Sequence, residues 1–234
     1  MSETEIDPRL PLLQDADIMD KIVLVRVDHN VVKKGMIHDP YRIDATLGTL
    51  YNIVERGGRL ILMSHVGRPR NKKTGEIEIT EDTSIAPVAD YLERKLHTRF
   101  VTPDFPSEPG IGIEAITTAI NWHIRDLRER RIGGIYLPNT RWFRGEEEKG
   151  ERRDRLARQL GGLADVYVND AFGSWQPHAS TFDLTKHLPS FAGFLMQKEL
   201  RNLKSVLTPK RPFIAVVAGS KYDTKIGPLS AIYE

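Results

Sequence analysis

Short apolar runs alternate along this chain with longer segments of helical periodicity. Each run is bounded by glycine or by a polar cluster, which is typical of a strand buried on both faces of a parallel sheet. Strands separated by helical patterns predict an α/β fold, a Rossmann-like parallel sheet with helices on both faces. The predicted strands are Ile22–Val25, Leu60–Met63, Arg99–Thr102, Ile135–Leu137, Val166–Val168 and Phe213–Val217.

Helices are predicted in the segments between these runs. The first is expected to begin at Asp39, an N-cap residue followed by proline, and to end at Gly57. A turn or hairpin is expected at Lys33–Gly35, and a loop over the proline- and glycine-rich residues 102–112. The other helices are expected over residues 85–96, 113–131, 145–160 and 193–207, the last of them long and amphipathic.

Polar residues follow four of the predicted strands at their carboxyl ends. The sequences there are R-V-D-H-N, S-H-V-G-R-P, P-N-T-R-W and V-N-D-A-F-G. Carboxyl ends of parallel strands share one edge of a sheet, where α/β proteins bind ligands. Taken singly, each residue also suits a structural role, as a turn former, a solvated arginine or a core histidine. Their joint placement predicts a site for a small, multiply charged anion such as a phosphorylated carboxylic acid, formed by Arg26, Asp28, Asn30, Arg42, His65, Arg68 and Arg141.

A second polar cluster follows the last predicted strand. Gly219, Ser220 and Lys221, with Lys225 beyond them, are similar to a phosphate-binding turn at a helix start. The sequence does not match the Walker A pattern. An ordinary turn between a strand and a helix is the other interpretation of this spacing.

Composition narrows the class of protein. The chain has 34 basic and 32 acidic residues and a net charge of +2, so it lacks the basic character of a nucleic-acid binder. It has no cysteine, which excludes disulfides, thiolate catalysis and zinc–thiolate sites. The N-terminus does not match a secretory signal, and no run approaches the roughly 20 apolar residues of a membrane helix. We therefore expect a cytoplasmic protein that binds neither nucleic acid nor membrane. The arginines within 128–131 are interpreted as a solvated helix end.

Several motifs occur in an order that resembles phosphoglycerate kinase. They are R-V-D-x-N, L-M-S-H-x-G-R-P, N-x-R, E-E-E-K, A-D-V-Y-V-N-D-A-F-G, H-A-S-T and A-G-F-L-M-x-K-E-L, within Lys21–Ile226. The resemblance implies a phosphotransferase of glycolysis, which moves a phosphoryl group reversibly between 1,3-bisphosphoglycerate and ADP. It also implies two Rossmann-like domains joined by a long helix. Residues 1–190 would then be the substrate domain, 191–207 the linking helix, and 208–234 the start of the nucleotide domain.

The resemblance also implies roles for individual residues. Arg42 would be catalytic, because it would stabilise the transferring phosphoryl group, a step that depends on positioning and charge neutralisation. The substrate 3-phosphoglycerate would be held by Arg26, Asp28, Asn30, Arg42, His65, Arg68 and Arg141. The phosphates of ATP or ADP, bound with Mg²⁺, would meet Gly219, Ser220, Lys221 and Lys225. No metal ligand is assigned within the chain. The chain is expected to be a monomer. By itself it is expected to bind 3-phosphoglycerate without turnover.

Three departures from the family pattern leave an alternative open. His29 and Val32 stand where the family has phenylalanine and proline, and Thr224 stands where it has aspartate. The family sequence close to H-R-A-H-A-S is replaced by W-Q-P-H-A-S, so a substrate-binding arginine is missing near Gln176. Losing one such clamp costs roughly 2–4 kcal/mol of transition-state stabilisation. The alternative is therefore a divergent non-catalytic paralogue that binds a phosphorylated acid.

Overall fold

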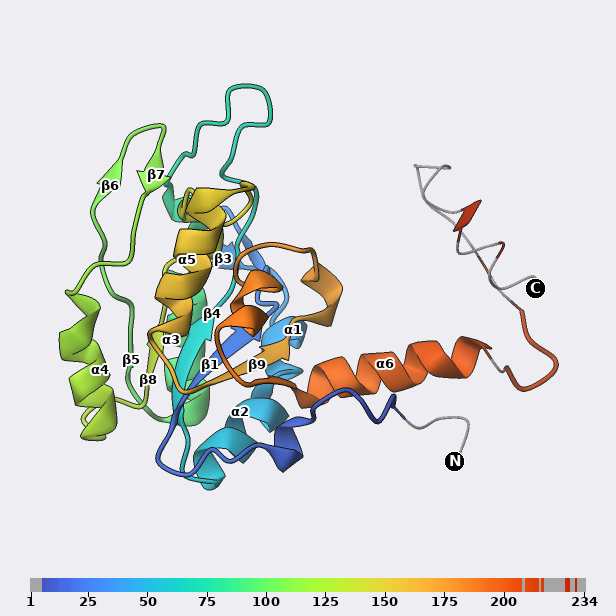
Figure 1. Cartoon of the computed structure of the whole chain (residues 1–234). Coiled ribbons are helices and arrows are strands. Elements are labelled where there is room, and N and C mark those ends of the chain that lie inside the picture. Colours follow the sequence, from blue (N-terminus) through green and yellow to red (C-terminus); the bar gives the residue numbers. More distant parts are fainter. Residues whose placement is uncertain (1–5, 208, 215, 217–225, 228–229, 231–234) are drawn as a thin grey trace.

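The computed structural model describes residues 6–207, 209–214, 216, 226, 227 and 230. Within them, six strands form a sheet in the order β10-β9-β1-β4-β8-β5, and every pairing is parallel. The predicted α/β fold with a parallel sheet is confirmed (Figure 1). The strands are β1 (Ile22–Val27), β4 (Arg59–Met63), β5 (Phe100–Val101), β8 (Gly134–Tyr136), β9 (Val166–Asp170) and β10 (Ser190–Ala192).

Alternate residues of the central strand β1 pack on opposite faces of the sheet. Val23, Val25 and Val27 contact one apolar cluster, to which α2 (Leu47–Glu55), α3 (Ala86–Leu96) and α6 (Phe194–Leu207) contribute. Ile22 and Leu24 contact the other, with α4 (Ile120–Arg128) and α5 (Glu151–Gly161). Burial on both sides explains why these strands appear in the sequence as continuous apolar runs.

Strands β1 and β4 are neighbours, with Val25 opposite Leu62. The loops that follow Val27 and Met63 therefore leave the same edge of the sheet side by side. This adjacency is what the predicted anion site requires.

The structure corrects three helix predictions. The segment after Asp39 forms two helices, α1 (Tyr41–Asp44) and α2, because Thr46 turns its hydroxyl back to the carbonyl of Ile43 at 2.8 Å. The helix expected over 113–131 is confined to α4. The helix expected from residue 145 begins at Glu151, after Gly150 with a φ of 84°. Of the acidic residues before it, Glu147 and Glu148 form ion pairs, and Glu146 accepts hydrogen bonds from Ser180.

Smaller elements lie between these helices and strands. The hairpin predicted at Lys33–Gly35 is confirmed, with Lys34 and Gly35 at positive φ. The loop expected over 102–112 contains a second hairpin. The hairpin strands are β2 (Val32–Lys33), β3 (Met36–Ile37), β6 (Ser107–Glu108) and β7 (Gly112–Ile113), and the 3-10 helices are Leu13–Asp15, Glu81–Thr83, Thr140–Trp142, Phe172–Ser174 and Asp183–Lys186.

The long helix α6 begins at the carboxyl end of β9 and extends away from the sheet (Figure 1). The buried Asp170 accepts hydrogen bonds from the backbone N–H groups of Leu195 and Met196 at 2.9 and 3.1 Å. Burial raises the pKa of Asp170. In the motif V-N-D-A-F-G, this aspartate therefore serves to attach the helix to the sheet.

Two predicted features lie wholly or partly outside the described residues. Ala215 and Val217 of the strand predicted over Phe213–Val217 are not described, nor are Gly219, Ser220, Lys221 and Lys225 of the predicted phosphate-binding turn. In the described part of the chain, no helix combines the length and apolar character needed to cross a membrane.

Candidate functional site

Arg26 and His65 form the buried centre of the predicted site. Arg26 is the penultimate residue of strand β1 and is only 1% exposed. Its Nη2 lies 3.0 Å from Nδ1 of His65, which follows the neighbouring strand β4. Because a guanidinium can only donate hydrogen bonds, Nδ1 of His65 is the acceptor and the ring proton is carried by Nε2. Arg26 thereby sets the tautomer of His65 so that Nε2–H is available as a donor.

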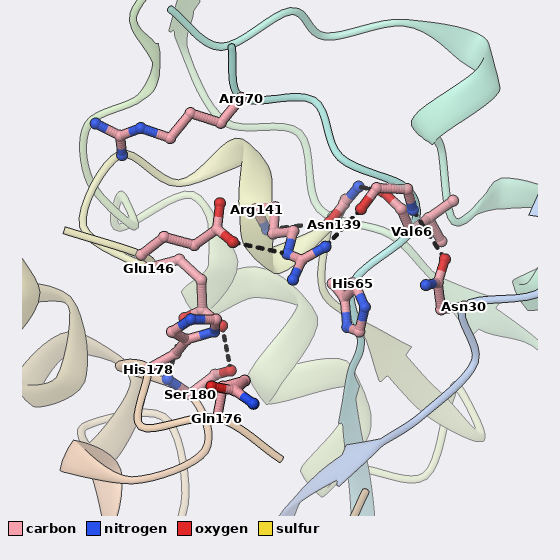
Figure 2. Close-up of polar contacts among 12 residues, drawn as sticks. Asn30, His65, Val66, Arg70, Asn139, Arg141, Glu146, Gln176, His178 and Ser180 are labelled. Atoms are coloured by element: carbon pink, nitrogen blue, oxygen red, sulfur yellow. Dashed lines mark hydrogen bonds and ion pairs between the residues drawn. The ribbon is translucent and has the colours of Figure 1, made fainter. Parts of the chain in front are cut away.

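A buried carboxylate balances the charge of Arg26 through a serine. Arg26 Nε donates to the hydroxyl of Ser180 at 3.0 Å, and that hydroxyl donates to Glu146. The second carboxylate oxygen of Glu146 accepts the backbone N–H of Ser180 at 3.0 Å. Glu146 is 1% exposed. This relay of Arg26, Ser180 and Glu146 joins β1 to the loops before α5 and after β9. Figure 2 shows Glu146 and Ser180 within it.

Several cationic side chains lie near His65. Burial, together with the charges of Arg26, Arg141, His178 and Arg42, lowers the pKa of His65 to about 2. His65 is therefore neutral at physiological pH. Figure 2 shows the side chains of His65, Arg141 and His178 around a common region. Residues from four separate segments thus act on one imidazole.

Asp28 and Arg42 form the outer part of the site. Arg42, in the first turn of α1, donates from Nη1 to Oδ2 of Asp28 at 3.0 Å. The Arg42 side chain is 52% exposed. The other oxygen of Asp28, Oδ1, is buried and has no hydrogen-bond partner among the described residues. Asp28 thus orients an accessible guanidinium and retains an unused acceptor.

The loop after β4 is held by contacts from two other strand ends. Asn30 accepts the N–H of Gly67 at 2.9 Å, and Arg141 donates to the carbonyl of Gly67 at 2.6 Å. Arg141 also lies 3.1 Å from Glu147. Burial lowers the pKa of Arg141, and the nearby charge of Arg68 adds to this effect. Arg68 itself is exposed and has no ion pair among the described residues, so it remains available to a ligand.

Two hollows adjoin Arg42. The larger, about 640 Å³, lies beside α6 and is lined by Asp28, Arg42 and Lys198 among others. The smaller, about 400 Å³, is lined by Asn30, Arg42 and Gly67 among others. Either has space for a small phosphorylated acid. Of the seven residues predicted to bind the anion, Asp28, Asn30 and Arg42 line these two hollows. The other four, Arg26, His65, Arg68 and Arg141, lie at the same carboxyl edge of the sheet.

The structure also reveals contributors that the sequence did not identify as site residues. They are Glu146, Ser180, His178 and Glu147, which support or adjoin the predicted cations. Their motifs, E-E-E-K and H-A-S-T, were visible in the sequence, but nothing local distinguishes a buried carboxylate from a solvated one. Gln176 lies where the family pattern has the missing arginine, and it is exposed. Its backbone carbonyl accepts a hydrogen bond from the backbone N–H of His178 at 2.7 Å.

His29, another departure from the expected pattern, is accommodated inside the core. Its ring nitrogens lie 2.9 Å from the hydroxyls of Tyr136 and Thr46. Burial, with the charge of Arg26, lowers the pKa of His29 to about 3. His29 is thus a neutral, hydrogen-bonded core residue outside the anion site.

These features define a class: an α/β protein with arginines and a buried histidine gathered at the carboxyl edge of its parallel sheet. Comparison with known proteins identifies the family. The family model for phosphoglycerate kinase matches residues 13–234. The chain belongs to the phosphoglycerate kinase family.

Relatives and solved structures agree with this assignment. The phosphoglycerate kinases of Synechococcus sp. (strain CC9311) and Finegoldia magna are 41% and 37% identical, over 96% and 95% of this chain and 52% of each relative. The structure of phosphoglycerate kinase from Coxiella burnetii matches with a TM-score of 0.71 and 29% identity, over 94% of this chain and 51% of that one. The chain spans about half the length of the curated relatives it matches.

Proposed function

We propose that this chain carries the 3-phosphoglycerate site of a phosphoglycerate kinase, which exchanges a phosphoryl group between 1,3-bisphosphoglycerate with ADP and 3-phosphoglycerate with ATP. The observation that carries the proposal is the convergence of arginines from separate segments around the neutral His65. Arg42 and Arg68 keep accessible guanidinium groups beside it, which suit the charged oxygens of an anion. Family membership supplies the reaction.

In this proposal the inner and outer residues have different tasks. His65 donates from Nε2 to an oxygen of the bound acid, in the tautomer that Arg26 imposes. Arg68 and Arg141 neutralise the phosphate and carboxylate charges of the bound acid. Asp28 holds Arg42 in place, and Asn30 holds Gly67. Arg42 is the catalytic residue, because its exposed guanidinium can meet charge that develops on the transferring group. The chain needs no strong base, since phosphoryl transfer depends mainly on positioning and charge neutralisation.

The remaining parts of the proposal concern organisation. Residues 1–190 would form the substrate domain, 191–207 the linking helix and 208–234 the start of a nucleotide domain. Gly219, Ser220, Lys221 and Lys225 would meet the phosphates of ATP or ADP with Mg²⁺. The protein would be a cytoplasmic monomer with no nucleic-acid or membrane partner.

A second candidate function is binding of a phosphorylated acid without catalysis. The exposed Gln176 favours this non-catalytic function, because the family pattern close to H-R-A-H-A-S has a substrate-binding arginine at this place. The two candidates share the same anion site and differ only in turnover.

Titration calorimetry with 3-phosphoglycerate tests the site that both candidates share. His65→Ala removes one hydrogen bond to a charged ligand, worth about 1.5–3 kcal/mol, and should weaken binding roughly tenfold to a hundredfold. Arg94→Ala, which removes an exposed cation on α3, is the control and should bind like the parent chain. Equal affinity of the His65→Ala variant and the parent would refute the site.

A coupled assay of ADP formation on the gene product, with the 234-residue chain in parallel, then separates the candidates. Turnover by the gene product supports the kinase. Binding of 3-phosphoglycerate with no turnover supports the second candidate.

A further inference from the structure

The amino edge of the sheet carries a second set of arginines, at the end opposite the candidate site. Strands β4, β8 and β5 are adjacent and parallel, so their first residues share one edge. Arg59 begins β4, Arg99 immediately precedes β5, and Arg130 and Arg131 precede β8. The sequence alone suggested only a solvated helix end for the last two.

A cavity of about 300 Å³ lies among these four arginines. Its other lining residues, in the described part of the chain, are glycines, one threonine and aliphatic side chains, and none is acidic. The backbone N–H groups of Gly57, Gly58 and Gly133 already bond to backbone carbonyls. The guanidinium groups are therefore the main hydrogen-bond donors that the cavity offers.

Arg59 is only partly used by the protein. Its Nη2 donates to Oδ1 of the exposed Asp20 at 3.1 Å, whereas its Nε and Nη1 are buried and have no partner among the described residues. The same Asp20 oxygen lies 3.6 Å from Nη2 of Arg130. One exposed carboxylate is thus shared by two guanidinium groups.

The local charges do not cancel. Arg131 is paired with Asp126 at 2.9 Å and also with Glu129. In the described part of the chain, no carboxylate lies within ion-pair distance of Arg99, which is exposed. Arg59 and Arg130 therefore share the carboxylate of Asp20, and Arg99 has none within ion-pair distance. Such an excess of positive charge favours an anionic acceptor.

We propose that this cavity is a second anion site, which binds a small phosphate-type oxyanion through Arg59, Arg99 and Arg130. Arg59 supplies the buried donors and Arg99 the unpaired charge. This second site shares no residue with the site at the carboxyl edge. Its test is therefore independent of the proposed kinase function.

Titration of the chain with inorganic pyrophosphate, followed by backbone amide NMR at constant ionic strength, tests the proposal. The expected result is a saturating shift of the Gly58 and Gly133 amides, separate from any shift of Gly67 at the carboxyl edge. Arg99→Gln should weaken that response at least tenfold. Because Arg99 is exposed, this variant is expected to keep the fold even where Arg59→Gln does not.

Two controls accompany the titration. Arg128→Gln removes an exposed arginine of the same charged segment that does not line the cavity, and Arg68→Gln removes a cation of the other edge. Both should leave the Gly58 and Gly133 response unchanged. A response confined to Gly67, a linear shift that follows salt alone, or an Arg99→Gln variant that responds like the parent would overturn the proposal.

Discussion

The relay from Arg26 through Ser180 to Glu146 makes a prediction about stability. Both ionised groups are 1% exposed, and the serine hydroxyl connects them. Removing one member of a buried charged pair costs about 3–5 kcal/mol, because the other charge stays buried without compensation. Arg26→Met should therefore destabilise the chain by about that amount. Glu146→Gln should cost a similar amount, since Arg26 loses its counter-charge and the amide oxygen can accept from only one of the two Ser180 donors.

The double variant measures the coupling directly. In the Arg26→Met/Glu146→Gln variant both charges are absent, so no buried charge is left without its partner. The loss in free energy of unfolding should therefore be about 1–3 kcal/mol smaller than the sum of the two single losses. Urea unfolding of the four chains gives the cycle. A matched cycle of Arg26→Met with Glu151→Gln, an exposed residue at the start of α5, should be additive. Additivity of the Arg26 and Glu146 changes within about 0.5 kcal/mol would refute the relay.

Imidazole nitrogen NMR provides a second readout of the same arrangement. In the parent chain, His65 should be a single tautomer with its proton on Nε2, because Nδ1 accepts from Arg26. In Arg26→Met, the pKa of His65 should rise but stay below its ordinary value, since burial is the larger cause of the shift. A purely structural role for Arg26 would leave the His65 tautomer unchanged.

Three further predictions concern single residues. Arg42→Ala should abolish turnover of the gene product in the coupled assay yet leave the chain folded, because the Arg42 side chain is half exposed. Normal activity would exclude the catalytic role. Burial lowers the pKa of His29 from 6.5 to about 3, so between these values the unfolded chain binds a proton that the folded chain does not. The free energy of unfolding should therefore be highest above pH 6.5 and should fall as the pH drops toward 3. His29→Phe should flatten that slope in urea titrations, whereas exposed His38→Phe should not. Gln176→Arg should tighten 3-phosphoglycerate binding in calorimetry, and unchanged affinity would argue against a ligand contact at this position.

The sheet and the position of the site were predictable because their signals are local. Strand β1 appears as the run Ile22–Val25 because all its residues are buried. The polar residues follow such runs directly, so their shared edge follows from parallel topology alone. Strand β10 was missed because Ser190 and Phe191 are only half-buried at the edge of the sheet and form no apolar run.

The wrong helix boundary before α5 has a tertiary cause. Three consecutive glutamates suit the first turn of a helix. Glu146, however, is buried against Ser180, and Glu147 and Glu148 pair with Arg141 and Arg70. These partners lie in distant segments, so no window around residue 146 could reveal that the helix begins only at Glu151.

The arginines and the histidine at the carboxyl edge fall into two groups. Arg26 is buried and, through Ser180 and Glu146, charge-balanced within the protein, and the neutral His65 beside it is also buried and hydrogen-bonded. Arg42 and Arg68 are accessible, and Arg42 has one ion pair, to Asp28. Because the inner charges are already compensated, a ligand gains little from them except the donor that His65 presents. An incoming phosphorylated acid would instead be bound by the outer arginines together with Nε2–H of His65, so substitution of Arg26 should alter stability first, and substitutions of Arg42, Arg68 and His65 should alter affinity first.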